Sequence, residues 1–549
     1  MELRMHLCSS LAKIFPLKGP DQPSFRSASA LKGERFSFQL AFIAVENRAL
    51  KAEVLSPLKK RISLKRVELM PVRYTSWYRA EGDDVISSDP GLYPDALLPV
   101  DGTFRFAPGQ WNSLWVTVDV PAGCKPGKYP VSVRLSNPDN PEESVESPVF
   151  TLEVLNAALP HQTLIHTEWF HADCLATYYK VPVWSEEHWR IVENFVRSAA
   201  AHGINMLLTP VFTPPLDTRV GGERPTTQLV GVTLENGGYS FDFSRLERWI
   251  DMARKAGIEY LEISHLFTQW GAAFCPKIVA TVDGKEKRIF GWDVKSDSRK
   301  YRSFLDSFLP ALTSFLTEHG WKDKTFFHCS DEPAPAHLET YGKAVSIMRK
   351  HLKDFKICDA LSSVDYYQKG LVSIPIPGED HIEPFLQAGI EKPWTYYCCG
   401  QLEKVSNRFL HMPSSRNRIM GTLLYRYDCT GFLQWGFNFY HTVHSVASVD
   451  PWSVLDADYA FPPGDAFMVY PGVDGQPVDS IHYETFTEGL QDLRALRLLE
   501  GKVPREKLCA MLDKLSPGGR MSMKEYPRGE AAVLALRKKI NSLIKKHFA

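Results

Sequence analysis

The sequence predicts a multidomain protein that combines β and α/β structure. We expect an N-terminal β-sandwich over residues 1–157, a (β/α)8-like (TIM) barrel over residues 161–478, and a C-terminal helical extension over residues 479–549 packed on the barrel. Three observations predict this architecture. A chain of 549 residues is too long for one hydrophobic core. Its first part carries short alternating runs between Pro and Gly turns, and its second part repeats a helix, a Gly and an apolar strand.

Short runs of alternating apolar and polar residues mark the expected strands of the N-terminal part. Residues 36–42 and 115–120 alternate in this way, and the runs at residues 128–135 and 149–154 complete the pattern. Several short strands at this spacing are typical of a β-sandwich. Residues 156–160 then form the expected linker to the next part.

Three consecutive units in the second part each consist of a helix that ends at a Gly and continues into an apolar strand. Repeats of this kind predict parallel βα units that close into a barrel. A doubly wound open sheet is the alternative, but no Gly-rich phosphate loop follows a strand to support it. The units are the helix capped by Ser185 and ended by Gly203 before residues 204–208, the helix opened by Ser244 and ended by Gly257 before residues 258–263, and the helix ended by Gly320 before residues 325–328.

The bulk composition excludes several classes of partner. Lys+Arg and Asp+Glu both number 64, so no basic excess is available for nucleic acid. No uncharged apolar run is long enough for membrane insertion, and the first residues lack the apolar core of a secretory signal. The ten Cys have neither CxxC nor zinc-like spacing. Taking Met1 as the native start, we expect a cytoplasmic protein with reduced thiols, no metal and no cofactor; the sequence leaves the oligomeric state open.

Asp331 and Glu332 are the strongest candidates for catalysis. They follow the strand expected at residues 325–328, and barrels of this kind carry their active-site groups at the carboxyl ends of strands. Glycosidic bond cleavage needs a proton donor at the leaving oxygen and negative charge near an oxocarbenium-like transition state. The sequence Ser-Asp-Glu-Pro at residues 330–333 also has the pattern of a helix start, which is the structural alternative.

The adjacency of the two carboxylates narrows the chemistry. In the usual scheme two carboxylates flank the scissile bond at a defined separation, which neighbours in a chain do not easily reach. They suit substrate assistance, in which the sugar's 2-acetamido oxygen is the nucleophile, Glu332 protonates the leaving group and Asp331 orients the acetamido group and supports an oxazoline-like intermediate. The pair therefore points to an N-acetylated hexosamine.

Two alternatives to this function stay open. One is a glycosidase of a non-acetamido sugar in which Glu332 works with a separated carboxylate; Glu262, Asp365 and Asp428 lie near expected strand ends. The other is a non-catalytic carbohydrate-binding protein on a barrel. The intact acidic pair argues against this second alternative.

Six further residues near expected strand ends are predicted to contact the sugar. We expect the Tyr396 hydroxyl to lie on the acetamido oxygen and Trp435 to form a floor under the sugar ring. Asn438 offers an amide to sugar hydroxyls. For each of the six, core packing or loop ordering is the competing interpretation. The other three are His265 and Trp270, which follow the strand at residues 258–263, and His171, which follows the first barrel strand.

Five short motifs, in order along the chain, carry a family resemblance. They are Ser-Asp-Glu-Pro at residues 330–333, Trp-Thr-Tyr-Tyr-Cys-Cys-Gly at 394–400, Gly-Phe-Leu-Gln-Trp-Gly-Phe-Asn at 431–438, and the stretches at 464–472 and 488–492. The set resembles glycoside hydrolase family 123. Residues 9–16 are similar to the family's first strand, so the likeness covers most of the chain.

The resemblance implies both a fold and an activity. The fold is a β-sandwich followed by a (β/α)8-like barrel. The activity is that of a retaining, substrate-assisted β-N-acetylgalactosaminidase on glycosphingolipid-type glycans. Carried over to this chain, Asp331 stabilises the acetamido group and Glu332 is the general acid/base. We therefore expect an exo-acting enzyme whose partner is an oligosaccharide or glycolipid glycan.

Overall fold

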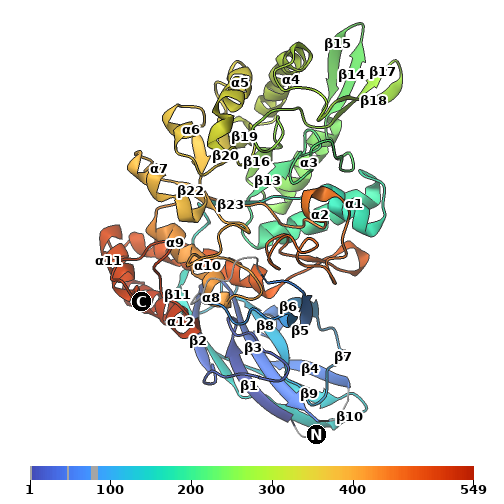
Figure 1. Cartoon of the computed structure of the whole chain (residues 1–549). Coiled ribbons are helices and arrows are strands. Elements are labelled where there is room, and N and C mark those ends of the chain that lie inside the picture. Colours follow the sequence, from blue (N-terminus) through green and yellow to red (C-terminus); the bar gives the residue numbers. More distant parts are fainter. Residues whose placement is uncertain (1–2, 46–48, 76–83, 549) are drawn as a thin grey trace.

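The computed structural model describes residues 3–45, 49–75 and 84–548. Strands of the N-terminal region lie at one end of the molecule and the barrel lies at the other, with helices from the end of the chain between them (Figure 1). Along the chain, a β-rich region is followed by the barrel and then by further helices.

Two sheets form the β-rich N-terminal region. Side chains of both sheets contribute to one hydrophobic core, in which the Phe38 ring lies 4.3 Å from the nearly parallel Phe150 ring of the other sheet. Burial of these apolar side chains stabilises the two sheets against each other. The first sheet has the order β1 (Leu3–Ser9), β3 (Arg35–Ala44), β8 (Asn112–Asp119), β5 (Ile62–Val72) and β6 (Gly91–Pro99). The second has β2 (Ser27–Lys32), β11 (Phe150–Ala158), β9 (Gly127–Asn137), β4 (Ala49–Leu55) and β7 (Thr103–Arg105), and β10 (Asn140–Glu146) pairs with β9.

Eight parallel strands form a nearly closed barrel, which confirms the predicted βα organisation. At its seam, the Tyr396 N–H donates to the Pro377 carbonyl at 3.0 Å, and Gly378 bridges to Tyr396 in parallel register. The residues just after β21 therefore connect it to β22, although the two strands share no regular run of hydrogen bonds. Around the barrel the order is β21 (Ile374–Ile376), β20 (Lys356–Ala360), β19 (Thr325–Phe327), β16 (Tyr260–Ile263), β13 (Met206–Thr209), β12 (Ile165–Glu168), β23 (Gly431–Gln434) and β22 (Trp394–Tyr396).

Helices connect the barrel strands. Ser185 caps α2 as predicted, because its hydroxyl accepts a hydrogen bond from the His188 N–H at 3.2 Å. Gly257 ends α3 with φ 100°, a left-handed conformation that Gly adopts without steric cost. The helices are α1 (Ala172–Tyr179), α2 (Glu186–Ala201), α3 (Ser244–Ala256), α4 (Arg299–Glu318), α5 (Leu338–Arg349), α6 (Asp365–Gln368), α7 (Glu383–Gln387), α8 (Ser414–Arg418) and α9 (Met420–Arg426).

A four-stranded sheet outside the barrel has no counterpart among the predicted elements (Figure 1). One hairpin, β14 (Gly231–Glu235) and β15 (Gly238–Asp242), follows β13; the other, β17 (Ile278–Val282) and β18 (Lys285–Phe290), follows β16. The Phe241 ring packs 5.3 Å from the Phe308 ring of α4. The long loops after β13 and β16 are therefore joined to each other and to the barrel.

The last part of the chain packs closely on the barrel. It contains the short pair β24 (Tyr470–Pro471) and β25 (Pro477–Val478), and the helices α10 (Ile481–Glu500), α11 (Arg505–Leu515) and α12 (Glu530–His547). A Cβ atom at Gly421 of α9 would lie 1.7 Å from the Gly489 carbonyl oxygen of α10, so only Gly permits this approach. Leu496 and Ile540 share one hydrophobic core with the barrel.

Buried ion pairs join three regions of the chain. Arg418 of α8 contacts Asp492 of α10 at 2.8 Å, and Arg537 of α12 contacts Asp492 at 2.6 Å. Arg537 also contacts Glu34 of the N-terminal region at 2.6 Å. The expected division at residues 1–157, 161–478 and 479–549 stays a prediction.

Candidate active site

A cavity of about 190 Å³ lies at the carboxyl ends of the barrel strands. Five of the predicted site residues line it: Asp331, Glu332, Trp270, Tyr396 and Trp435. A larger cavity of about 690 Å³ lies between β2 and α12, away from these strand ends, and its Arg418 and Arg537 are already paired. The barrel cavity is therefore the candidate active site. Its remaining lining residues are Trp169, Leu216, Asp217, Gln269, Ala360, Cys398, Cys399, Leu433, Val443, His444 and Phe461.

Backbone hydrogen bonds hold the acidic pair just beyond β19. The Glu332 N–H donates to the Ala360 carbonyl at 3.0 Å, and the Trp270 N–H donates to the Asp331 carbonyl at 2.9 Å. Glu332 has φ 40°, a left-handed conformation that costs a non-Gly residue energy and persists where the surroundings impose it. The Tyr396 hydroxyl donates to Glu332 Oε1 at 2.7 Å. Three neighbouring strand ends thus position the pair.

The helix-start interpretation of residues 330–333 is wrong. The Ser330 hydroxyl donates to the Thr268 carbonyl at 2.8 Å instead of capping a helix, and α5 begins only at Leu338. The chain after β19 is irregular at the acidic pair because neighbouring loops, and not a helix, satisfy its backbone groups.

The Asp331 carboxyl group resists ionisation. Burial raises the pKa of Asp331 well above its ordinary value, and the negative charge of Glu332 raises it further. The nearby His328 opposes this rise. In the free protein Asp331 therefore keeps its proton to higher pH than an isolated Asp does. A ligand that brings a hydrogen-bond donor or a developing positive charge to Asp331 would favour its ionised form.

Aromatic side chains form the walls of the cavity. The Trp435 indole N–H donates to Asp465 Oδ2 at 3.0 Å, which fixes the plane of the ring. Trp270 is 38% exposed, and its ring lies 5.4 Å from the His444 ring. Trp169, which sequence reasoning missed, directly follows β12 and lines the same cavity. Aromatic faces of this kind suit the apolar C–H face of a sugar ring.

Three predicted contact residues do not line the cavity. His265 is completely buried beside Trp169 and His328, and both of its ring nitrogens lack a hydrogen-bond partner among the described residues. Asn438 is buried and exchanges hydrogen bonds with the His171 backbone, at 2.8 Å to its N–H and 3.1 Å to its carbonyl. The His171 ring contacts the Trp435 carbonyl at 3.0 Å. His171 and Asn438 thus support the Trp435 segment from behind.

A buried network lies behind the acidic pair. The His328 ring contacts Glu262 at 2.5 Å and Asp359 at 3.0 Å. Asp359 also accepts the N–H groups of Cys329 and Ser330, at 3.1 and 3.4 Å. Two backbone bonds therefore fix the residues immediately before Asp331.

The carboxylates considered as separated partners for Glu332 all lie outside the cavity lining. Glu262 is buried and accepts the Trp169 indole N–H at 2.8 Å as well as the His328 contact. Asp365 begins α6 on the exposed surface, and Asp428 pairs with Arg497 at 2.6 Å. The cavity instead holds a third carboxylate, Asp217, from the long loop after β13.

Sequence reasoning missed Asp217 and His444 because each lies in a long loop rather than at a strand end. Asp217 follows β13 at a distance along the chain, and His444 follows β23 in the same way. No local pattern marks either residue. By contrast, the rule that selected other strand ends would also have selected Trp169.

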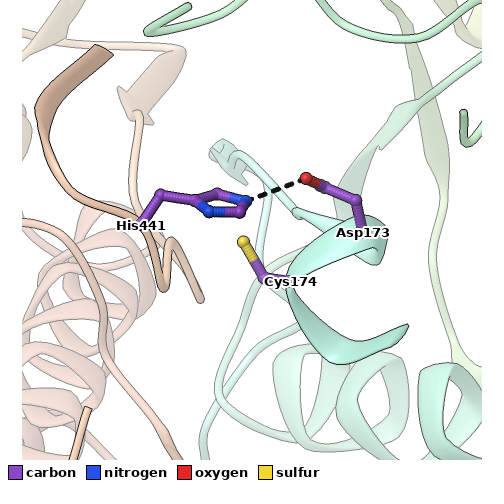
Figure 2. A group of neighbouring side chains, drawn as sticks. All are labelled: Asp173, Cys174 and His441. Atoms are coloured by element: carbon purple, nitrogen blue, oxygen red, sulfur yellow. Dashed lines mark hydrogen bonds and ion pairs between the residues drawn. The ribbon is translucent and has the colours of Figure 1, made fainter. Parts of the chain in front are cut away.

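A group of potential metal ligands lies behind the cavity wall. Figure 2 shows Asp173, Cys174 and His441 converging, and one ligand-type atom of each lies within 4.8 Å of the others. Arg224 already makes two hydrogen bonds to Asp173, at 2.6 and 2.9 Å, and the His441 ring bonds the same carboxylate at 3.0 Å. Although burial alone would lower it, Cys174 and Asp173 raise the pKa of His441 to about 10. An imidazolium beside a guanidinium does not suit a divalent cation, so this group is an ion network that supports the wall.

The fold and the site together define a class of protein. A barrel with an acidic pair in a small, aromatic-walled cavity at its strand ends is typical of a glycoside hydrolase. The family model described as "Glycoside hydrolase 123, catalytic domain" matches residues 169–499. The chain belongs to glycoside hydrolase family 123 and is therefore a glycosidase.

One solved structure shows the same fold. A family 123 glycoside hydrolase from Clostridium perfringens, described for the details of glycolipid glycan hydrolysis, has a TM-score of 0.75 at 17% identity, with 100% of this chain and 99% of that chain covered. A cyclomaltodextrinase has a TM-score of 0.31 at 9% identity, with 90% and 84% covered, and carries no argument. Comparison with curated proteins gave no match. Within the described residues, no helix combines the length and apolar character needed to cross a bilayer.

Proposed function

We propose that the chain is a retaining exo-glycosidase that releases β-linked N-acetylhexosamine by substrate-assisted catalysis. The proposed sugar is N-acetylgalactosamine from glycosphingolipid-type glycans. The observation that carries the proposal is the position of two adjacent carboxylates, Asp331 and Glu332, on one small cavity, with the Tyr396 hydroxyl on the second.

The proposed roles follow from this geometry. Glu332 protonates the leaving oxygen and later activates water, while Asp331 accepts the acetamido N–H and supports the positive charge of the oxazoline-like intermediate. The Tyr396 hydroxyl bonds Glu332 in the free enzyme and is assigned to the acetamido oxygen when substrate enters. The scheme requires no metal and no cofactor, so EDTA should leave the activity unchanged.

The size of the cavity supports exo action. A cavity of about 190 Å³ lies below the roughly 300–1,000 Å³ that is usual for drug-sized ligands, so it suits one terminal sugar better than a chain of sugars. The choice of a glycolipid glycan rests on the Clostridium perfringens neighbour, whose description names glycolipid glycan hydrolysis.

The decisive experiment compares aryl β-GalNAc, β-GlcNAc and β-galactoside substrates with wild-type protein, Asp331→Asn and Glu332→Gln. Substrate assistance predicts cleavage of the acetamido sugars alone, inhibition by a thiazoline analogue, and loss of most activity in both variants. Asp365→Asn is the matched control, because it removes an exposed carboxylate outside the cavity. Equal activity on the plain galactoside would refute the mechanism, and full activity of Glu332→Gln would remove the proposed acid.

A further inference from the structure

A third carboxylate lines the same cavity as the acidic pair. Asp217 comes from the loop after β13, and the barrel order separates it from Asp331 by the loop after β16, which contributes Gln269 and Trp270. Three carboxylates therefore share one small cavity. No Lys or Arg occurs among the described residues that line it.

The structure holds Asp217 in one fixed orientation. Its backbone N–H donates to Gln269 Oε1 at 2.6 Å, and its carboxylate Oδ2 accepts the His444 N–H at 2.8 Å. The Ser445 hydroxyl donates to its carbonyl at 2.7 Å. Asp217 has φ 37°, and His444 and Ser445 have φ 61° and 52°, so the two loops that meet here are both strained. Strain of this kind persists where the surrounding contacts define a functional geometry.

A buried ion network supports this orientation from behind. Arg224 donates to the Leu216 carbonyl at 3.2 Å, immediately before Asp217, and binds Asp173 at the start of α1. His441 bonds the same Asp173 and begins the segment that leads to His444 (Figure 2). The Asp173–Arg224–His441 network thus ties together both loops that hold Asp217.

One oxygen of Asp217 is left for a ligand. Oδ2 bonds His444, whereas Oδ1 has no hydrogen-bond partner among the described residues. Asp217 is half-buried and Oδ1 stays accessible, so a ligand that donates a hydrogen bond can take the place of water at this oxygen. Sugar hydroxyls are such donors, whereas an anionic group such as a sulfate is disfavoured in an acidic cavity whose described lining has no Lys or Arg.

We propose that Asp217 is a specificity-determining residue that accepts a hydrogen bond from an unsubstituted hydroxyl of the bound sugar and excludes sugars with an anionic substituent at that hydroxyl. The proposal rests on the proposed function for the identity of the sugar. The proposal adds one requirement: the hydroxyl of the terminal hexosamine that faces the loop after β13 carries no charged substituent.

The test measures kcat/KM of wild type and Asp217→Asn on aryl β-GalNAc and on its 4-sulfated and 6-sulfated forms. We expect the variant to lose about 10- to 100-fold on the neutral substrate, the factor for losing a hydrogen bond to a charged group. Wild type should discriminate strongly against at least one sulfated form, and the variant should discriminate less. Asn tolerates a left-handed backbone and retains an acceptor for the His444 N–H. Asp217→Gly, which adopts positive φ freely, tests the same loss without the amide.

A matched control separates recognition from a general effect of charge or strain. Asp283 lies at the turn between β17 and β18 with φ 52° and an 85% exposed side chain, so Asp283→Asn makes the same substitution in the same backbone conformation away from the cavity. We expect its kcat/KM to stay within about twofold of wild type.

Several outcomes would overturn the inference. Unchanged kcat/KM and unchanged sulfate discrimination in both Asp217 variants would show that Asp217 does not contact the sugar. A loss above about 10,000-fold with rescue by azide would identify Asp217 as a nucleophile instead. Should wild type cleave only the plain galactoside, the proposed function fails, and the same comparison with the galactoside and its sulfated forms still tests Asp217.

Discussion

Replacing Tyr396 by Phe removes one hydroxyl from the active site and little else. That hydroxyl donates to Glu332 Oε1 at 2.7 Å, whereas the backbone of Tyr396 is held separately by the Pro377 carbonyl at 3.0 Å. The ring is almost completely buried, so Phe fills the same space. The substitution therefore tests the polar contact without disturbing the seam of the barrel.

The expected magnitude follows from the partner. A hydrogen bond to a charged group contributes about 1.5–3 kcal/mol, which corresponds to a fall in kcat/KM of about 10- to 150-fold. If the hydroxyl turns to the acetamido oxygen in the transition state, the loss should appear mainly in kcat rather than in KM. Steady-state assays on aryl β-GalNAc give both constants.

Tyr397 provides the matched control. It is the next residue along the chain, its side chain faces the packing side of the strand, and its hydroxyl contacts Asn417 Oδ1 at 3.3 Å. Tyr397→Phe should cost about 1 kcal/mol of stability and change kcat/KM by less than about twofold. Equal losses of activity in the two variants, or wild-type kcat/KM in Tyr396→Phe, would refute the assigned role of Tyr396.

Two further predictions concern titration and packing. In Glu332→Gln the pKa of Asp331 should fall, because the variant removes the negative charge of Glu332 that raises this pKa. Thiazoline binding requires ionised Asp331, so the pH below which binding weakens should move to a lower value in calorimetric titrations. An unchanged pH dependence would contradict the effect of Glu332 on Asp331. Gly421→Ala should destabilise the protein by about 3 kcal/mol, because its Cβ would lie 1.7 Å from the Gly489 carbonyl oxygen. Thermal melting should show no such loss in Gly342→Ala, whose Cβ would meet nothing closer than 3.8 Å within α5; equal effects would argue against the helix contact.

Local sequence signals were sufficient to predict three of the barrel strands and the position of the acidic pair after the third of them. Ser185 begins a helix because its hydroxyl caps the first turn, and Gly257 ends one because it adopts a left-handed conformation easily. The strands between such signals are runs of apolar residues, which loops seldom contain. Asp331 was found because it directly follows such a strand. A residue that follows a barrel strand in the sequence also lies at the end of the barrel where active sites form.

The same rule cannot tell which side chain beyond a strand faces the cavity. His265 and Trp270 both follow β16, yet His265 stacks on His328 inside the barrel while Trp270 lines the cavity. Which one faces substrate depends on how the loop after β16 packs against its neighbours. Asp217 is even harder to predict from the sequence, because its position is fixed by Gln269 and His444, which belong to two other loops. Such contacts between distant segments leave no local pattern to read.

The ion pairs of Arg537 have a consequence for how the chain can be divided. The family model matches residues 169–499, but Arg537 of α12 neutralises Asp492 inside that segment and Glu34 before it. A protein trimmed to the matched segment would leave Asp492 paired with Arg418 alone and would expose the apolar surface beneath α12. We therefore expect the unit that folds to be larger than the matched segment. We expect the trimmed protein to aggregate and the whole chain to melt in one transition, which scanning calorimetry can check.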